Sequence, residues 1–275
     1  MSQHQKLERF ATIDEKRRCK HLPLLAASPL VLLILTTHQA FPMRKILVGA
    51  QLSLDGIMQA PGGTIEDPSN GFRFGGWAVP YFDQVGGEEI NRVLAEPCDL
   101  LLGRKTYEIF AAYWPYYNAN AEDGGIAELF RRITKYVVSS SANVDTSWAG
   151  TVLLRCIDDV RRLREESGPN LVTQGSTELV HALLAHDLVD AISTFTVPVV
   201  LGMGKKLFAD GSAPHSYRLT RSRVSDTGLV VAHYERAGEV MTADVSLDTP
   251  SDKERARQER MKREDGVSNA PEKQR

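Results

Sequence analysis

The chain has 275 residues, of which 42% are hydrophobic and 25% are charged, a mixture that excludes collagen-like, disulfide-rich and wholly disordered classes. Lys and Arg number 33 against 35 Asp and Glu, which gives a net charge of −2. We therefore expect no nucleic-acid partner, since proteins that bind nucleic acid usually carry a basic excess. The cysteines Cys19, Cys98 and Cys156 have no metal-ligand spacing and cannot all pair, so we expect free thiols, no metal site and a cytoplasmic location.

The N-terminal segment, residues 1–42, differs from the rest of the chain. Its apolar run at 22–36 is shorter than the roughly 20 residues that a spanning helix needs. Basic residues precede the run, as in a signal peptide, but no small residue stands at the −3 position before Phe41. A leader without a folded role is the favoured interpretation, ahead of a signal or membrane anchor and of a docked helix. We expect a disordered or leader-like extension and no membrane partner.

The C-terminal segment, residues 237–275, is strongly charged. Residues 252–265 (DKERARQERMKRED) contain no apolar stripe, so they form either a solvated helix or no helix. We expect a disordered, solubilising tail.

Between residues 43 and 236, short apolar runs alternate with segments of helical spacing, which predicts one domain. The predicted strands are 45–51, 99–102, 135–139, 151–154, 170–173, 191–200, 217–224 and 228–234. The predicted helices are 86–96, 106–113, 126–133, 157–167 and 177–186. Strands separated by helices pair in parallel and need helices on both faces of the sheet. The sequence thus predicts an α/β three-layer sandwich with a mainly parallel sheet and antiparallel C-terminal edge strands.

The segment after the second predicted strand is suited to an anion. Gly103 lets the backbone approach a ligand, and Thr106 is expected to cap the following helix, whose first amides favour negative charge. Arg104 supplies a planar fork for phosphate, and Lys105 supplies a point charge. An ordinary strand–helix turn with a surface Arg-Lys pair explains the same residues equally well.

Two further strand ends carry small polar residues. Gln174-Gly175-Ser176-Thr177 leads into a helix start, and Ser139-Ser140 follows a strand. A capped helix and a polar loop are the simpler explanations. Ligands of parallel sheets bind at the carboxyl ends of the strands, so the three segments together suit a dinucleotide. The common G-x-G-x-x-G fingerprint is absent from the sequence.

These segments resemble the dihydrofolate reductase superfamily, in which Gly103–Glu108 and Ser139-Ser140 match two cofactor contacts. The chain is more similar to the C-terminal, reductase domain of the bifunctional riboflavin-biosynthesis deaminase-reductase, in a stand-alone bacterial form. That family shows Ser-Leu-Asp-Gly after its first strand, here Ser53–Gly56, and a Pro-Val-x-Leu-Gly-x-Gly-Lys-x-Leu-Phe segment, here Pro198–Phe208. The resemblance covers residues 43–236, and the zinc motif of the deaminase half is absent.

The resemblance implies an NADPH-dependent oxidoreductase of the 5-amino-6-(5-phosphoribosylamino)uracil reductase type. Its expected substrate is a ribosylaminopyrimidine or a pteridine-like small molecule, and its expected assembly is a homodimer. The alternative is a non-catalytic nucleotide-binding protein on the same fold. An assay of NADPH oxidation separates the two hypotheses.

The expected cofactor-binding residues are Gly103, Arg104, Lys105, Thr106, Ser139, Ser140, Gln174, Gly175, Ser176, Thr177, Gly202 and Gly204. Among them, Arg104, Lys105 and Ser139 suit the ribose phosphate of NADPH. Asp55 is the expected catalytic residue, as a proton donor at the end of the first strand, although Asp-Gly is also a common turn pair. Dihydrofolate reductases also place a substrate-binding acid on the first helix, and no motif selects among Asp83, Glu88 and Glu89.

Overall fold

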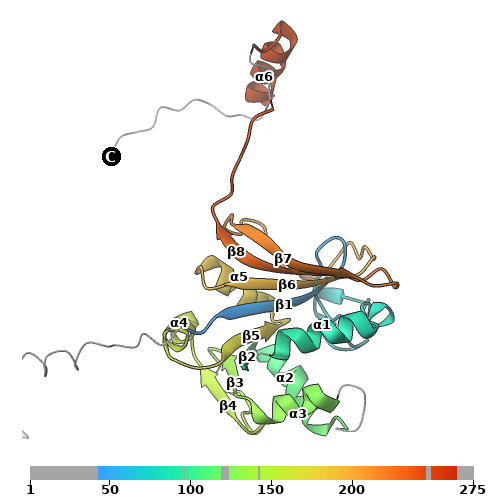
Figure 1. The fold of residues 1–275 in the computed structure, drawn as a ribbon, viewed down its shortest axis with the longest axis vertical. Helices are drawn as coiled ribbons and strands as arrows, with labels where there is room; N and C mark the ends of the chain where they lie inside the picture. Colours follow the sequence, from blue (N-terminus) through green and yellow to red (C-terminus); the bar gives the residue numbers. More distant parts are fainter. Residues whose placement is uncertain (1–42, 96, 119–123, 142, 246–248, 265–275) are drawn as a thin grey trace, which may run out of the picture. The chain divides into compact units, whose positions relative to one another are not determined.

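The computed structural model describes residues 43–95, 97–118, 124–141, 143–245 and 249–264, so the expectations for residues 1–42 lie outside it (Figure 1). The strands are β1 (Ile46–Leu52), β2 (Cys98–Gly103), β3 (Lys135–Val138), β4 (Thr151–Leu154), β5 (Asn170–Gln174), β6 (Ala191–Thr196), β7 (Ser216–Val224) and β8 (Val230–Gly238). The α-helices are α1 (Gln84–Ala95), α2 (Arg104–Tyr113), α3 (Gly124–Arg132), α4 (Ile157–Glu165), α5 (Thr177–Ala185) and α6 (Asp252–Glu264). Single 3₁₀ turns occupy Ser69–Gly71, Val79–Tyr81 and Trp114–Tyr116.

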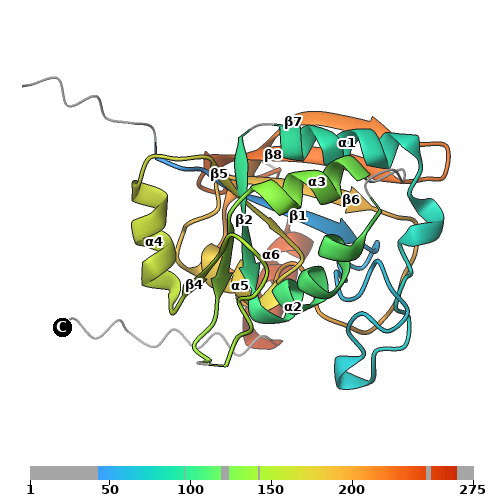
Figure 2. The same ribbon diagram turned by 90° about the horizontal axis from the view of Figure 1, so that it is seen from below.

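The strands form one mixed sheet in the order β4-β3-β2-β5-β1-β6-β8-β7. The six strands from β4 to β6 in this order pair in parallel, whereas β8 pairs antiparallel with both β6 and β7. The predicted mainly parallel sheet with antiparallel C-terminal edge strands is confirmed. The sheet twists strongly, so that β7 and β8 run across the view of Figure 2 while β2 and β4 run along it.

Helices cover both faces of the sheet because its central strands are apolar on both sides. In β2 the side chains of Leu100 and Leu102 lie on one face, and that of Leu101 lies on the other, as the two-residue period of a strand requires. The first face packs against α1, α2 and α3 through Leu94, Tyr107 and Phe130. The second face packs against α4 and α5 through Val160, Leu163, Leu179, Val180 and Leu183. This is the predicted three-layer sandwich.

One predicted strand is longer than the observed one. We expected strand structure over 191–200, but β6 ends at Thr196. Pro198 has no N–H group to donate to a neighbouring strand, so the ladder cannot continue in regular form through it. From Val197 to Leu207 the chain instead makes separate hydrogen bonds to the end of β1 and to the segment that follows it.

The tail was expected to be disordered, but its residues Asp252–Glu264 form the helix α6, which is the helical alternative of the two considered for residues 252–265. In α6 the Ser251 hydroxyl accepts the N–H of Glu254, and Arg257 pairs with Glu254 at 2.6 Å one turn away. None of the residues of α6 is buried. The helix is thus stabilised by its own cap and ion pairs, as expected for a solvated helix. Strand β8 ends at Gly238, two residues beyond the domain limit predicted from the sequence.

Among the described residues, no helix is long and apolar enough to span a membrane. The same residues contain no group of three or more His, Cys, Asp or Glu side chains arranged to hold a metal ion. Cys98 is buried and Cys156 is exposed, and both are free thiols.

Candidate functional site

The segments predicted to bind a cofactor lie in a row along one edge of the sheet. Strands β3, β2, β5, β1 and β6 are successive neighbours and parallel, so their carboxyl ends meet at that edge. Ser139 follows β3 at one end of the row, and Asp55 and Gly202 follow β1 and β6 at the other. Four inter-strand spacings of about 4.8 Å make the row roughly 19 Å long. We call this row the strand-end edge.

In the middle of the strand-end edge, the turns that open α2 and α5 are bonded to each other. The Gly103 N–H donates to the Ser176 hydroxyl at 3.0 Å, and the Ser176 N–H donates to Thr106 Oγ1 at 3.1 Å. This corrects the expectation that Thr106 caps its own helix, because α2 begins at Arg104 and Thr106 lies inside its first turn. The Thr106 hydroxyl instead fixes the neighbouring turn, so the two helix starts are held side by side.

These two helix starts differ from that of α1 in how their amides are satisfied. In α1 the Asp83 carboxylate accepts the first-turn N–H groups of Val85 and Gly86 at 3.0 and 3.3 Å. At α2 the N-cap residue is Gly103, which has no side chain to cap the helix. At α5 the N-cap residue is Ser176, and its side chain makes no cap hydrogen bond. The first-turn amides of α2 and α5 are therefore left to water or to an anion, which the helix dipole also favours.

The backbone between these helix starts leaves room for a ligand to come close. Gly175 has φ +68°, and a Cβ added there would lie 3.6 Å from the Thr106 side chain. A Cβ added to Gly103 would lie 3.6 Å from Ser176. Glycine at both positions keeps the space between α2 and α5 open, so the residues present fit the pyrophosphate of a dinucleotide.

The β3 end of the strand-end edge gathers cationic and hydroxyl side chains. Arg104 donates to the Glu108 carboxylate at 2.8 Å and keeps 41% of its side chain exposed, while Lys105 and Ser140 are exposed. Ser139 Oγ accepts the Ser141 N–H at 3.1 Å. Sequence reasoning missed Arg155, which follows β4 and donates to the Ser141 carbonyl at 2.7 Å. Its position directly after a parallel strand is the signal that points to it.

At the other end, Asp55 holds a loop. Its carboxylate accepts the Ser53 hydroxyl at 2.6 Å and the N–H groups of Leu201 and Gly202 at 3.1 and 2.8 Å. These hydrogen bonds, above all that from Ser53, lower the pKa of Asp55 to about 2. A carboxyl group with this pKa carries no proton at neutral pH, so the geometry favours a loop-holding role for Asp55 over proton donation.

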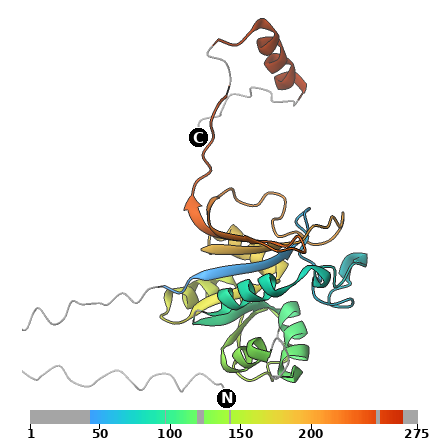
Figure 3. The ribbon, with the colours of Figure 1, turned by 45° about the vertical axis from the view of Figure 1, so that its right-hand side comes forward.

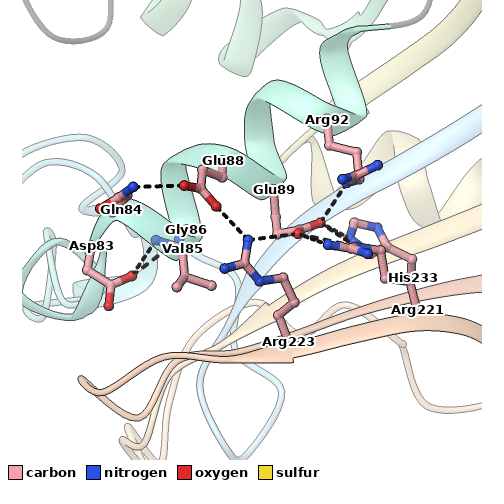
Figure 4. Close-up of polar contacts among 10 residues, drawn as sticks. All are labelled: Asp83, Gln84, Val85, Gly86, Glu88, Glu89, Arg92, Arg221, Arg223 and His233. Carbon is pink, nitrogen blue, oxygen red and sulfur yellow. Dashed lines mark hydrogen bonds and ion pairs between the residues drawn. The ribbon is translucent and has the colours of Figure 1, made fainter.

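The three acids near the first helix are all engaged by neighbours (Figure 4). Asp83 accepts the N–H groups of Val85 and Gly86 and so caps α1. Glu88 accepts from Gln84 at 2.9 Å and pairs with Arg223 at 2.6 Å.

Glu89 is the buried member of the set, with only 1% of its side chain exposed. It pairs with Arg221 at 2.8 Å, with Arg92 and Arg223 at 3.3 Å and with His233 Nε2 at 3.0 Å. The side chain faces Arg221, Arg223 and His233 of β7 and β8 (Figure 4). Glu89 thus ties α1 to the antiparallel strands.

Two cavities lie away from the strand-end edge. One of about 270 Å³ lies between the end of α5 and the segment before β7, lined by Leu184, Phe208, Ser212, Ala213, Pro214, His215 and Tyr217. The other, of about 410 Å³, lies near the amino end of β2 and includes Leu94, Cys98 and Arg132 in its lining. Neither contains a residue that the sequence singled out for the cofactor.

Comparison with known proteins identifies a family signature and several relatives. The signature of the RibD C-terminal domain matches residues 44–231, which include every segment of the strand-end edge. The "Uncharacterized protein YyaP" of Bacillus subtilis (strain 168) is 24% identical over 199 residues, which are 71% of this chain and 96% of that protein.

Two solved structures are also similar. Dihydrofolate reductase from Enterococcus faecalis, solved with NADP(H) and RAB-propyl, is 12% identical, with a TM-score of 0.45 over 70% of this chain and 96% of its own. A diaminohydroxyphosphoribosylaminopyrimidine deaminase/5-amino-6-(5-phosphoribosylamino)uracil reductase from Thermotoga maritima is 13% identical, with a TM-score of 0.48. That match covers 71% of this chain and 57% of the Thermotoga chain.

Proposed function

This chain belongs to the RibD C-terminal domain family, and on that premise we propose that it is an NADPH-dependent reductase. The proposed type is a 5-amino-6-(5-phosphoribosylamino)uracil reductase-like enzyme that transfers a hydride to a ribosylaminopyrimidine or a pteridine-like ring. The observation that carries the proposal is the pair of uncapped helix starts, α2 and α5, which are bonded to each other through Gly103, Thr106 and Ser176.

The residues of the strand-end edge have distinct roles in this proposal. The first turns of α2 and α5, with Gly175 and Thr177, would bind the pyrophosphate through backbone amides. Arg104 and Lys105, with the Ser139 and Ser140 hydroxyls, would hold the ribose phosphate through charge-assisted hydrogen bonds. Gln174 lies beside Gly49 in the pairing of β5 with β1, a position that would be under the middle of the cofactor.

NADPH, when bound, supplies the hydride from its nicotinamide ring. The carboxyl ends of β1 and β6 would orient that ring toward the acceptor carbon, with Gly202 allowing close approach, whereas glycine at the other expected position, Gly204, is required by packing against Ile57. When a C=N bond of the substrate is reduced, the carbon takes the hydride and the nitrogen must also gain a proton. Because Asp55 is ionised at neutral pH, we propose that water delivers that proton.

One observation favours a second candidate, a nucleotide-binding protein without turnover. Asp55, Asp83, Glu88 and Glu89 are all bonded to neighbouring residues, so none of these four acids is poised for a substrate. A cofactor site without a substrate-binding acid suits binding as well as catalysis.

Two measurements separate these functions. Fluorescence titration gives the dissociation constant of NADPH, and absorbance follows NADPH oxidation with a panel of ribosylaminopyrimidine and pteridine substrates. Oxidation that depends on one of these substrates supports the reductase. Tight NADPH binding without oxidation by any of them favours the second candidate, and the absence of NADPH binding removes both.

A further inference from the structure

Two segments far apart in sequence leave the sheet together and remain hydrogen-bonded beyond it. Residues 53–59, in blue, follow β1, and residues 197–207, in brown, follow β6 at the same end of the sheet (Figures 1 and 3). The Leu54 N–H donates to the Val199 carbonyl at 2.7 Å, which extends the pairing of the two strands. Further on, the Met58 N–H donates to the Lys205 carbonyl at 2.8 Å. The chain between Val199 and Lys205 is thus a short loop whose two ends are both hydrogen-bonded to the segment after β1.

Asp55 is hydrogen-bonded to the first half of this loop. One carboxylate oxygen accepts the Leu201 N–H at 3.1 Å, and the other accepts the Gly202 N–H at 2.8 Å. The carboxylate is itself fixed, because the Ser53 hydroxyl donates to it while accepting the Ile57 N–H at 2.9 Å. The two N–H groups bond to different oxygens of the carboxylate, and in an Asn side chain one of these two atoms would be an NH2 group, which donates and cannot accept.

A second set of hydrogen bonds, around Gln59 and Lys205, holds the other end of the loop. Gln59 is buried, with 3% of its surface exposed, and its Oε1 accepts the Lys205 N–H at 3.1 Å. The Lys205 ammonium pairs with Asp67 at 2.6 Å. Gln59 Nε2 also donates to the carbonyls of Asp67 and Ser69 at 3.0 Å. The loop after β6 and the long segment after β1 therefore form one bonded unit.

The residues between these two sets of hydrogen bonds, Leu201–Gly204, form a corner whose backbone is exposed. Gly202 has φ +73°, is exposed, and a Cβ added to it would meet no atom within 4 Å. Gly204 has φ +123°, and a Cβ there would lie 2.7 Å from the Ile57 side chain. Gly204 thus fits against the packed base, while Gly202 presents an open, side-chain-free surface at the carboxyl ends of β1 and β6.

We propose that Asp55 is a positioning residue, which holds the Leu201–Gly204 corner in place against the nicotinamide half of the cofactor. This inference rests on the proposed NADPH site. The corner lies at one end of the strand-end edge, and Arg104 lies toward the other, so Asp55 affects one half of a dinucleotide and not the other. In this role the carboxylate orders the backbone that the ring contacts, so the ligand does not pay for ordering it on binding.

The test compares two ligands that share one half. In the proposed site NADPH would span the whole strand-end edge, whereas adenosine 2′,5′-bisphosphate carries the ribose phosphate and no nicotinamide. The variant Asp55→Asn keeps the side-chain shape but cannot accept both N–H groups. Calorimetric titration should show NADPH weakened about tenfold, the scale of one charged hydrogen bond. Adenosine 2′,5′-bisphosphate should bind the variant and the wild type with the same affinity. Asp210→Asn, which changes an exposed acid three residues beyond that segment, is the matched control and should change neither affinity.

Each other outcome has a definite meaning. Equal weakening of both ligands would show that Asp55 supports the whole domain, and unchanged NADPH binding would place the corner away from the ring; either overturns the inference. If Asp55→Asn does not fold, Ser53→Ala, which removes the hydroxyl that donates to Asp55 and accepts the Ile57 N–H, should weaken NADPH selectively to a smaller extent, and equal or no weakening overturns the inference as before. If the wild type binds neither ligand, the proposed function itself is wrong, and the Asp55 inference is overturned with it.

Discussion

Replacing Arg104 by Ala should weaken NADPH binding far more than NADH binding. The Arg104 guanidinium now pairs with Glu108, one turn away on α2, with 41% and 46% of the two side chains exposed. Giving up an exposed helical pair of this kind costs about 0.3–0.5 kcal/mol, and a charge-assisted bond to a phosphate contributes about 1.5–3 kcal/mol. The difference, about 1–2.5 kcal/mol, corresponds to roughly a five- to sixtyfold loss of NADPH affinity. NADH lacks the ribose phosphate, so its affinity should not change.

Fluorescence titration of both cofactors against wild type and Arg104→Ala measures this difference. Glu108→Gln is the matched control, since it releases Arg104 from its pair and should tighten NADPH by about twofold. Equal weakening of NADPH and NADH would move Arg104 to the pyrophosphate or to a structural role. Unchanged NADPH binding would refute the reasoning and direct attention to Arg155, which bonds to the turn after β3.

Three further outcomes follow from the fold. In the folded protein the pKa of Glu89 is lowered to about 2, chiefly by the hydrogen bond from Arg221. As the pH falls, the unfolded chain therefore takes up a proton at this residue before the folded protein does. The contribution of Glu89 to the free energy of unfolding is thus present above about pH 4.5 and lost toward pH 2. The wild-type melting temperature should therefore fall more steeply than that of Glu89→Gln between about pH 5 and 3, and parallel curves would contradict this. A chain cut to residues 43–238 should unfold cooperatively in circular dichroism, because the sheet and its five covering helices lie within it; a molten product would mean that the ends contribute to the fold. The exposed apolar side chains of Leu219, Val224 and Val230 on β7 and β8 favour a homodimer, and a monomer by light scattering at micromolar concentration would remove that expectation.

The sequence by itself determined the succession of strands and helices along the chain and the edge of the sheet at which the candidate site lies. Buried parallel strands are continuous apolar runs, so β2 and β5 could be placed to within one residue from local composition. Once the strands are known to be parallel, their carboxyl ends must meet, which aligns the segments after β2, β3 and β5 without any knowledge of contacts.

Only the tertiary structure decided what the polar side chains of that edge do. Thr106 was expected to cap its own helix and instead bonds to Ser176, 70 residues away. Asp55 was expected to donate a proton, yet it is bonded to the N–H of Gly202, 147 residues further along the chain. The physical reason is that local sequence encodes the period and burial of an element, whereas a hydrogen-bond partner depends on which strands become neighbours. That choice is made by packing of the whole sheet, and it fixes both the partner and the protonation state of the side chain.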